Sequence, residues 1–387
     1  MCPRGFLLGA KLWPYAEHDK DSGAGMGLTT AIGVMSGTSM DAIDVAILRT
    51  DGAAVVETGP GRAYPYDPDL RSRLLAVLAH PEAAQHDPMH ALDVAVSDAH
   101  AGAVLSFLDD LAIDPGLVDV VGIHGQTIFH KPAARFTRQF GIGARMAATL
   151  GIDVVTRFRH ADVAAGGEGA PLAPLYHKAL AAGLEQPLMI LNLGGVANVT
   201  YLDGETVIAF DTGPASALLD DFLLRRRGQP YDANGALSAA GSPDPALLAH
   251  LLSHPYFARP APKSLDRNAF HAWAAAIDGI NDDATGAATL AAFTVASVVS
   301  AAGLVPGVAK RWLVTGGGRH NGTIMAHLHA ALGVPVDPVE TVGWDGDFLE
   351  AQCFGYLAVR TLAGLPLSLP TTTGVAHPMA GGEVWRA

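Results

Sequence analysis

Cysteine is almost absent from this chain of 387 residues, which contains only Cys2 and Cys353. Two cysteines are too few for a disulfide framework or for a metal site built from thiolates. The apolar stretch at residues 5–10 is short, ends at Lys11 and is followed by charged residues in place of a small-residue cleavage site. We therefore expect no export signal and a reducing, cytoplasmic location.

Long apolar runs and excess positive charge are also missing. No stretch approaches the roughly 18 consecutive apolar residues of a membrane-spanning helix, so we expect no membrane partner. The net charge of −13 argues against nucleic acid as the main partner. It leaves room for an anionic ligand, because local loops and cations bind phosphate even in acidic proteins.

The common nucleotide and zinc motifs are not found. The chain has no Gly-x-x-x-x-Gly-Lys-Ser/Thr loop, and the sequence GIGARM at residues 141–146 lacks the third glycine of a dinucleotide-binding turn. The 16 histidines show no His-Glu-x-x-His spacing, so we expect no dedicated zinc site.

Glycine and apolar residues are plentiful. With 49% hydrophobic residues, 16% charged residues and 44 glycines, the composition is typical of a globular α/β protein with many tight turns. A length of 387 residues exceeds one ordinary core and predicts two domains. We place a disordered extension, or an overcalled start, at residues 1–28, an N-terminal domain at 29–186 and a C-terminal domain at 187–387, with the last helix a candidate to pack back on the first domain.

The stretch from Ile32 to Ile47 predicts a strand, a tight turn and a returning strand. Ile32–Met35 and Ile43–Leu48 are apolar, and they flank the turn Ser36-Gly37-Thr38-Ser39, which is followed by Asp41. Glycine lets the backbone approach an anion, N–H and hydroxyl groups donate to phosphate oxygens, and a carboxylate holds Mg²⁺ or its water shell. The alternative is an ordinary hairpin that needs Gly and Ser for its dihedral angles.

The second half repeats this order of elements coarsely. Leu188–Leu193 predicts a strand, residues 194–198 a small-residue turn, and Val199–Leu202 a returning strand. Asp211-Thr212-Gly213 follows a further strand, and a third glycine-rich loop, residues 315–321, follows the strand Trp312–Val314. Two α/β halves with such turns imply a nucleotide between them and favour a phosphotransferase.

Apolar spacing predicts the remaining elements, and the prolines of residues 242–269 predict irregular structure near a cleft. The expected strands are 54–58, 118–123, 152–158 and 207–210, and the expected helices are 69–80, 89–111, 145–150, 172–182, 215–227, 285–304 and 347–362, followed by a Pro/Thr-rich tail.

Asp162 is the candidate general base. It follows Arg157 and Arg159 and precedes a glycine-rich run, so nearby positive charge is expected to keep its carboxylate ionised. The alternative is an ion-paired or helix-capping aspartate.

Seven blocks of residues, taken together and in order, resemble the anhydro-N-acetylmuramic acid kinase family. They are SGTSMDAID at 36–44, HGQT at 124–127, FRHADVAAGGEGAPL at 158–172, LNLGGVAN at 191–198, FDTGPA at 210–215, PKSLDR at 262–267 and TGGGRHN at 315–321. The resemblance covers nearly everything after residue 28. It implies the actin, hexokinase and Hsp70 superfamily, with two related ribonuclease H-like α/β domains around an ATP cleft.

The resemblance also implies an activity: ATP and water convert 1,6-anhydro-N-acetylmuramic acid to N-acetylmuramic acid 6-phosphate in peptidoglycan recycling. Asp162 matches the family's catalytic aspartate, which would deprotonate the attacking water. Phosphoryl transfer depends mostly on positioning and charge neutralisation, which loops of N–H donors and Mg²⁺ supply. The matching nucleotide-binding positions are Gly37, Thr38, Ser39 and Asp41 in the first phosphate loop, with Asp41 also a Mg²⁺ candidate; Gly194, Gly195, Asn198, Asp211 and Gly213 at the second; and Gly316, Gly317, Gly318 and Asn321 on the adenosine side.

Candidate sugar contacts come from three places. His124, Gln126 and Thr127 are donors and acceptors at the predicted domain junction, and Lys263, Ser264 and Arg267 suit the lactyl carboxylate or phosphates. Glu350 matches a family acid that reads sugar hydroxyls, although an exposed acid at a helix N-terminus would also explain it.

The resemblance suggests a homodimer, which the residues themselves do not show. Two rival functions stay open: an ordinary sugar kinase of the same fold that phosphorylates a free hydroxyl, and a sugar- and nucleotide-binding regulator without turnover. Four positions depart from the family pattern: Arg157, Ala42, Glu168 and Ile142 stand where an acid, a glycine, a glutamine and a polar residue are usual. None of them removes a proposed catalytic group.

Overall fold

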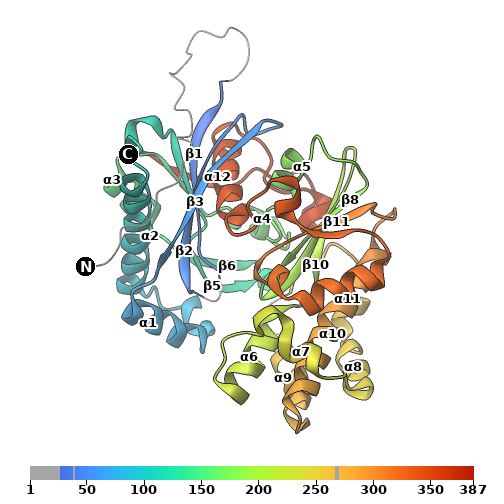
Figure 1. Cartoon of the computed structure of the whole chain (residues 1–387). Helices are drawn as coiled ribbons and strands as arrows, with labels where there is room; N and C mark the ends of the chain where they lie inside the picture. Colours follow the sequence, from blue (N-terminus) through green and yellow to red (C-terminus); the bar gives the residue numbers. More distant parts are fainter. Residues whose placement is uncertain (1–26, 38–39, 266–269) are drawn as a thin grey trace, which may run out of the picture.

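The computed structural model of the chain describes residues 27–37, 40–265 and 270–387. The predicted extension at residues 1–28 falls almost wholly outside these ranges. Two β-sheets with helices on their faces make up the described part, and a hairpin of β5 (Gln126–Lys131) and β6 (Phe136–Phe140) stands apart from both (Figure 1).

The first sheet has the strand order β13-β7-β4-β1-β2-β3. Strands β1, β2 and β3 form an antiparallel meander, β4 and β7 run parallel to β1, and β13, from the C-terminus, pairs antiparallel with β7. The bounds are β1 (Thr29–Met35), β2 (Ala42–Thr50), β3 (Val56–Pro65), β4 (Val120–Ile123), β7 (Val154–Thr156) and β13 (Glu383–Trp385).

The second sheet repeats that topology in the order β10-β9-β8-β11-β12. Strands β8, β9 and β10 form the meander, and β11 and β12 run parallel to β8. The bounds are β8 (Leu188–Leu193), β9 (Val196–Asp203), β10 (Thr206–Pro214), β11 (Arg311–Thr315) and β12 (Val336–Pro338). This repeated order, with its matching strand directions, is that of a ribonuclease H-like domain, so the prediction of two related α/β domains is confirmed. The boundary at residue 187 stays a prediction.

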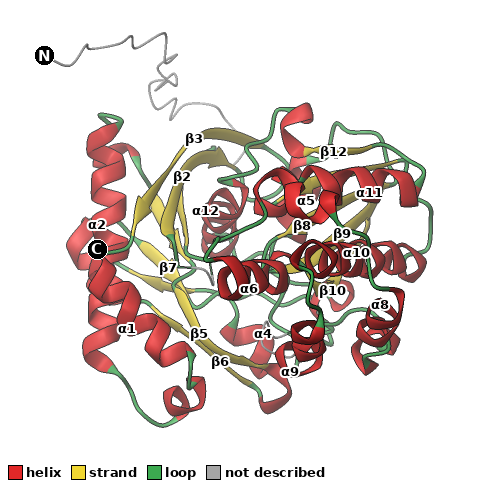
Figure 2. Ribbon diagram, turned by 60° about the horizontal axis from the view of Figure 1, so that its bottom comes forward, coloured by secondary structure: helices red, strands yellow, loops and turns green. Residues whose placement is uncertain are grey.

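Helices cover both faces of each sheet (Figure 2). They are α1 (Pro68–Leu78), α2 (His90–Asp110), α3 (Gly143–Leu150), α4 (His160–Ala164), α5 (Pro174–Leu180), α6 (Ser216–Arg227), α7 (Ala236–Ala240), α8 (Pro245–Leu252), α9 (His271–Ala274), α10 (Asp283–Ala301), α11 (Gly322–Leu332), α12 (Leu349–Leu362) and α13 (Pro370–Thr373).

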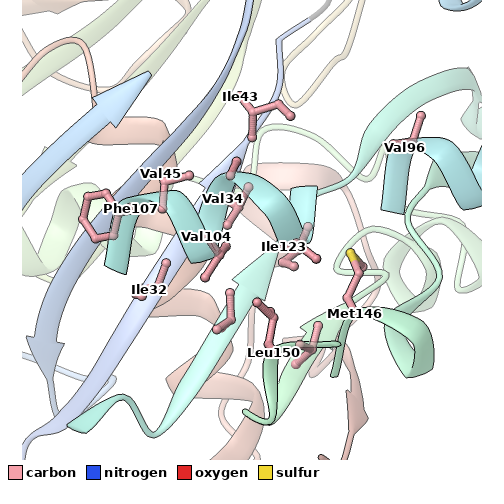
Figure 3. Close-up of a cluster of buried hydrophobic side chains, with 14 of the residues drawn as sticks. Ile32, Val34, Ile43, Val45, Val96, Val104, Phe107, Ile123, Met146 and Leu150 are labelled. Carbon is pink, nitrogen blue, oxygen red and sulfur yellow. The ribbon is translucent and has the colours of Figure 1, made fainter. Parts of the chain in front are cut away.

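Side-chain alternation along β1 explains which helices pack on which face of the first sheet. Ile32 and Val34 point toward α2 and α3, where they join one buried cluster with Phe107 and Met146 (Figure 3). Residues 31, 33 and 35 point the other way, toward α12. In the second sheet, Leu191 and its neighbours pack against α10 and α11, which leaves the opposite face turned toward α5 and the first sheet.

Helix α12 lies between the two sheets and touches the first one backbone to backbone (Figures 1 and 2). A Cβ on Gly33 of β1 would lie 1.7 Å from the Ala351 carbonyl oxygen, and one on Gly122 of β4 would lie 2.0 Å from that of Phe354. Only glycine allows such an approach. The N-terminus of α12 is therefore held at a fixed height above the strands.

Most predicted elements are confirmed, including the two strand–turn–strand units. The expectation of irregular structure throughout 242–269 is wrong, because α8 lies within it. Its prolines were read as breakers, but Pro245 is the first residue of the helix and Asp244 caps it by accepting from the Leu247 N–H at 2.9 Å. Sequence patterns also missed β5, β6, α11 and the strand β13 in the tail.

By length and composition, two described helices are apolar enough to cross a membrane: α2 and the stretch Asp283–Leu304 that contains α10. Half of the α2 window and 61% of the other are buried inside the protein, as in core helices. Neither stretch is an uninterrupted apolar run, so the expectation about consecutive apolar residues is not contradicted. Counting uninterrupted apolar residues overlooked helices in which serine, threonine and aspartate are interspersed.

We predict that Gly33→Ala destabilises the protein by about 3 kcal/mol or more, because the added methyl group forces α12 off the sheet. Urea unfolding measures the change. Gly102→Ala is the matched control: Gly102 lies on the exposed side of α2 with no atom within 4 Å of an added Cβ, and should gain roughly 0.5–1 kcal/mol from helix propensity. Equal stabilities of the two variants would contradict the packing argument.

Candidate active site

The turn between β1 and β2 is supported from below by a buried polar network. Thr38 and Ser39, two of the predicted phosphate contacts, lie outside the described residues. Ser36 donates to Gln126 Oε1 at 2.6 Å, and Gln126 Nε2 donates to the Gly37 carbonyl at 3.4 Å. Tyr66 donates to Ser36 at 2.9 Å. Gln126 is fully buried, so its observed task is to hold the turn in shape.

Two acids follow this turn and have different surroundings. Asp41 is exposed and forms an ion pair with Arg71 at 3.1 Å. Asp44 points to the same side of the first sheet as α12. Burial, reinforced by the negative charges of Glu350 and Asp347, raises the pKa of Asp44 to about 7. Burial and the two neighbouring carboxylates therefore make it costly for Asp44 to carry its negative charge.

A polar row crosses the second sheet on the face turned toward the first. The residues are cross-strand neighbours, so their side chains share one face: Asp211 pairs with Asn198, Asn198 with Asn192, and Asn192 with Thr315. Two of the four, Asp211 and Asn198, were predicted as nucleotide contacts. Asn192 was missed because it lies inside a run that otherwise reads as a buried strand.

The turn after β8 and the start of α6 are joined through the backbone. The Ala215 N–H donates to the Gly195 carbonyl at 3.1 Å, and the Ser216 N–H donates to the Gly194 carbonyl at 3.0 Å. Gly213, which precedes α6, packs so closely on α10 that an added Cβ would lie 2.9 Å from the Ser297 Cβ. The two sequence blocks that predicted the second phosphate loop are thus one unit of structure.

The three glycines after β11 differ in what surrounds them. A Cβ on Gly316 would lie 2.3 Å from Asn192 Oδ1, and one on Gly318 would lie 2.6 Å from the Leu193 Cβ. Gly317 is exposed, with no atom within 4 Å of an added Cβ. Asn321 caps α11 by accepting from the Ile324 N–H at 3.0 Å. Among these three glycines, only Gly317 has open space around it.

Glu350, at the start of α12, reaches the polar row. Asn192 Nδ2 donates to Glu350 Oε1 at 2.8 Å and so links the second sheet to the helix that packs on the first. Burial of the carboxylate raises the pKa of Glu350, although the charge of Arg159 and the Asn192 hydrogen bond act in the opposite direction. The Glu350 residue is exposed to solvent at the start of α12, and its hydrogen bond to Asn192 is what distinguishes it from a free helix-terminal acid.

Arg159 is the cation at the centre of these acids. Its Nε donates to His124 Nε2 at 3.0 Å, and its Nη1 donates to the Gly169 carbonyl at 2.7 Å. The charges of Glu350 and Asp211 raise its pKa, but burial outweighs them and lowers it. Because His124 Nε2 accepts from a guanidinium, the ring is neutral, and burial holds the pKa of His124 well below its usual range.

Asp162 lies on α4 with its side chain buried and held by three donors. The Gly169 N–H donates to Oδ1 at 2.7 Å, Thr373 donates to Oδ2 at 2.6 Å, and Ser368 also donates to Oδ2. A Cβ on Gly167 would lie 2.2 Å from Oδ1, so the missing side chain leaves that oxygen accessible from the Gly167 side. Asp162 is therefore a rigidly oriented carboxylate.

A pocket of about 460 Å³ adjoins Asp162 through Gly167. Ser264 donates to Glu168 Oε2 at 2.5 Å, and Arg259 forms an ion pair with Glu168 Oε1 at 3.3 Å. The pocket is lined by Glu82, Phe129, His130, Lys131, Pro132, Ala133, Gly166, Gly167, Glu168, Arg259 and Ser264. This cavity is large enough for a single sugar ring and is lined by both acidic and basic side chains.

The other predicted sugar contacts are dispersed. Lys263 is buried over the Tyr256 ring, 4.6 Å from its centroid, and burial lowers its pKa. Thr127 accepts weakly from Gln139 at 3.4 Å, and Arg267 lies outside the described residues. Beside Lys263, the Asp211 carboxylate accepts from the Leu265 N–H at 2.7 Å, yet burial raises the pKa of Asp211 to about 7.

Sequence reasoning missed four residues that the structure brings to this region: Asn192, Arg159, Ser368 and Thr373. Arg159 carried a signal, since it stands in the same block as Asp162. The two hydroxyl residues lie in the Pro/Thr-rich tail, where no local pattern marks them. Among the described residues, no group of three or more His, Cys, Asp or Glu side chains has the arrangement of a metal site.

We predict that the stability of the protein falls as pH rises from about 4 to 7, partly because of Asp44. Its folded pKa, about 7, exceeds the unfolded value of 3.8, so the folded state binds the extra proton in this window and loses that advantage above it. Three pKa units set a ceiling of about 4 kcal/mol, and remaining solvent contact reduces it to roughly 1–2 kcal/mol.

Urea unfolding at pH 5 and pH 8 tests this prediction. Asp44→Asn should lose less stability between the two pH values than the parent protein does, whereas the control Asp109→Asn, on the exposed side of α2, should lose as much. Equal pH dependence in both variants would show that Asp44 titrates normally.

Known proteins resemble this chain along nearly its whole length. The sequence profile of the anhydro-N-acetylmuramic acid kinase family matches residues 29–387. Anhydro-N-acetylmuramic acid kinase of Rhodospirillum rubrum is 52% identical over 365 residues, which cover 93% of this chain and 95% of that protein. The enzyme of the same name from Acidiphilium cryptum is 54% identical over 361 residues, covering 92% and 98%.

A third relative, from Rhodopseudomonas palustris, bears the same name and is 48% identical over 375 residues, covering 93% of this chain and all of that protein. The seven sequence blocks, the repeated topology and these matches agree. This chain belongs to the anhydro-N-acetylmuramic acid kinase family.

Proposed function

We propose that this protein uses ATP and water to convert 1,6-anhydro-N-acetylmuramic acid to N-acetylmuramic acid 6-phosphate, as a step of peptidoglycan recycling. The observation that carries the proposal is the buried Asp162 carboxylate, which adjoins a sugar-sized pocket on one side of the space between two ribonuclease H-like sheets. The polar row of the second sheet and the open Gly317 lie on the nucleotide side.

The reaction joins two bond changes. Asp162 takes a proton from water, the water oxygen bonds to the anomeric carbon, and the bond from that carbon to the bridging oxygen breaks. The released 6-oxygen then attacks the γ-phosphorus, and ADP leaves. Because phosphoryl transfer depends mainly on alignment and charge neutralisation, the remaining residues have to hold the two substrates in line.

The two glycine turns and the loop after β11 are proposed to bind ATP. The residues assigned to its phosphates are Gly37, Thr38, Ser39, Asp41, Gly194, Gly195, Asn198, Asp211 and Gly213, and those assigned to adenosine are Gly316, Gly317, Gly318 and Asn321. The contacts indicate that the glycines of this set have two different roles. Gly316, Gly318 and Gly213 allow close packing, while Gly317 leaves room for the ligand.

The sugar is proposed to occupy the 460 Å³ pocket, with its anomeric carbon toward Gly167 and Asp162. Ser264 and Arg259 meet Glu168 there, and Glu350 is placed to accept from sugar hydroxyls. His124 is proposed to position Arg159 by accepting its hydrogen bond. Gln126 is proposed to position the first phosphate turn through its hydrogen bonds with Ser36 and Gly37. Thr127, Lys263 and Arg267 stay assigned to the sugar side.

Mg²⁺ is proposed to bind together with the nucleotide, near Asp41 and Asp44. The fit rests on the two carboxylates themselves, and a bound cation would relieve the repulsion of Asp44 from Glu350 and Asp347. When bound, Mg²⁺ would offset charge on the phosphates. The chain's own task there is to hold these two carboxylates at the start of β2, directly after the first phosphate turn.

We also propose that the protein is a cytoplasmic homodimer without nucleic acid or membrane partners. Size-exclusion chromatography with light scattering measures the oligomeric state. The rival function, phosphorylation of a free hydroxyl, differs in the fate of water. In H₂¹⁸O, a brief reaction should place ¹⁸O on the anomeric carbon, whereas an ordinary sugar kinase leaves the sugar unlabelled.

The central prediction is that Asp162→Asn lowers turnover by roughly 10²–10⁴-fold, because an amide cannot accept the proton. Purified enzyme is incubated with ATP, Mg²⁺ and the anhydro sugar, and ADP and phosphorylated sugar are measured. The Asp162→Asn variant should still bind ATP, as measured by calorimetry. Asp203→Asn, at the exposed end of β9, is the control. Near-normal turnover of Asp162→Asn would remove this residue from the base role.

A second prediction concerns the nucleotide side. Gly317→Val should raise KM for ATP about tenfold or more while leaving urea stability unchanged, because the new side chain enters space free of protein atoms. Gly183→Val, at another glycine without neighbours within 4 Å, should leave KM unaltered. An unchanged KM in both variants would place adenosine elsewhere.

A further inference from the structure

The C-terminal segment after α12 returns to Asp162 and contributes two buried hydroxyl groups. Ser368 is 1% exposed and Thr373 is fully buried. Both side chains donate to the same oxygen, Oδ2 of Asp162. Thr373 makes a second contact with the same turn, because its carbonyl accepts from the Glu168 N–H at 2.6 Å. These residues are 206 and 211 positions away from Asp162 in the chain.

A neighbouring residue shows what a purely local role in this segment looks like. Thr372 Oγ1 accepts from the Leu369 N–H at 3.0 Å and so closes the short helix α13 on itself. Ser368 and Thr373 instead direct their hydroxyls across to α4. The segment is anchored independently of them, since the Leu367 N–H donates to the Met379 carbonyl at 2.7 Å. The two hydroxyls are therefore not needed to close the segment.

The number of hydrogen bonds on each oxygen determines which one remains reactive. A carboxylate oxygen has about two acceptor positions. Oδ2 accepts from both Ser368 and Thr373 and is saturated. Oδ1 accepts from the Gly169 N–H and keeps one position, on the atom that an added Gly167 Cβ would approach to 2.2 Å. Gly167 also lines the pocket, so the remaining position faces the side from which substrate water would come.

From this geometry we infer that Ser368 and Thr373 are positioning residues for the base: they saturate Oδ2 and fix the orientation of the carboxylate, so that Oδ1 takes the proton from the attacking water. The inference rests on the proposed function, in which Asp162 is that base. Orientation by second contacts keeps a catalytic group within the narrow range that reaction requires.

The charged groups around Asp162 do not orient its carboxylate in the way that the two hydroxyls do. Arg159, on the same segment, is the cation that acts on it, and Asp211 of β10 and Glu350 of α12 share that cation. Across the pocket, Glu168 is paired with Arg259. Burial lowers the pKa values of His130 and His160 to about 4, so both rings are neutral at neutral pH.

The test compares Thr373→Val, Ser368→Ala and Thr373→Ser in the full chain. Thr373→Val keeps the shape and removes the hydroxyl; kcat should fall about tenfold or more, with KM for ATP within twofold of the parent value. Thr373→Ser should restore most of kcat. The same Thr→Val change at Thr371, which is exposed on α13, should have no effect.

The separation of kcat from KM, together with rescue by Thr373→Ser, supplies a readout that mere loss of structure would not give. The fall in kcat should be larger in the Ser368→Ala/Thr373→Val double variant than in either single variant, with KM for ATP still within about twofold of the parent value. If Asp162→Asn is inactive while Thr373→Val and Ser368→Ala keep the parent kcat, the positioning role is overturned.

Activity in Asp162→Asn would instead overturn the base assignment itself, and the positioning role with it. Ser368→Ala removes a single oxygen atom. If Thr373→Val fails to fold, the kinetics of Ser368→Ala decide the test. A fall in kcat in that variant accompanied by a raised KM for ATP and a loss of urea stability would assign the hydroxyl to packing alone and overturn the inference.

Discussion

The contact between α12 and the first sheet is the constraint on which the site depends. Gly33 and Gly122 remove the side chains that would hold the helix away from the strands, and the helix carbonyls occupy that space. This close approach sets the position of Glu350 at the N-terminus of α12. It also directs the chain that leaves the other end of the helix, and that chain brings Ser368 and Thr373 back to Asp162. One backbone contact thus places groups at two parts of the site.

The charge distribution between the sheets is the physical argument for the proposed Mg²⁺. Arg159 lies among the carboxylates of Asp162, Asp211 and Glu350, and one guanidinium cannot offset all of them. Burial raises the pKa values of Asp44 and Asp211, and neighbouring carboxylates raise them further. A nucleotide triphosphate would add further negative charge. Close approach of its phosphates to this region therefore requires added positive charge, which is what Mg²⁺ carried with the nucleotide provides.

Local chemistry made much of the fold predictable from the sequence. The unit at residues 32–47 combines apolar strands with a Gly/Ser turn, and the structure has β1 and β2 there. The unit at Leu188–Leu202 follows the same rule. Short strands such as β13 carry no pattern of their own and exist because an edge strand, β7, offers them a partner. Prolines at the start of α8 gave a misleading signal because a helix-starting proline and a breaking proline look alike in a short window.

Site residues were predictable where they stand in short blocks with a chemical pattern, as Asp162, Asn198 and Asp211 do. Ser368 and Thr373, in contrast, approach Asp162 through the tertiary fold alone. Asn192 illustrates the same limit. Its neighbours Ile190 and Leu188 share its face of β8 and are buried in a cluster with Ala181 and Val339, so the strand pattern is apolar. Its polar role becomes evident only when Glu350 is found 2.8 Å away.

The two sheets share a topology but have specialised in opposite ways. On the face of β1 turned toward the second sheet, residues 31, 33 and 35 are alanine, glycine and methionine, and α12 fills the space above them. On the corresponding face of β8, residues 188 and 190 are apolar and residue 192 is an asparagine. The neighbouring strands add Asn198, Asp211 and Thr315 to this face. The first sheet therefore supports a helix that carries an acid into the site, while the second offers its own polar row to the ligand. A repeated fold gains an asymmetric site in this way without any change in strand order.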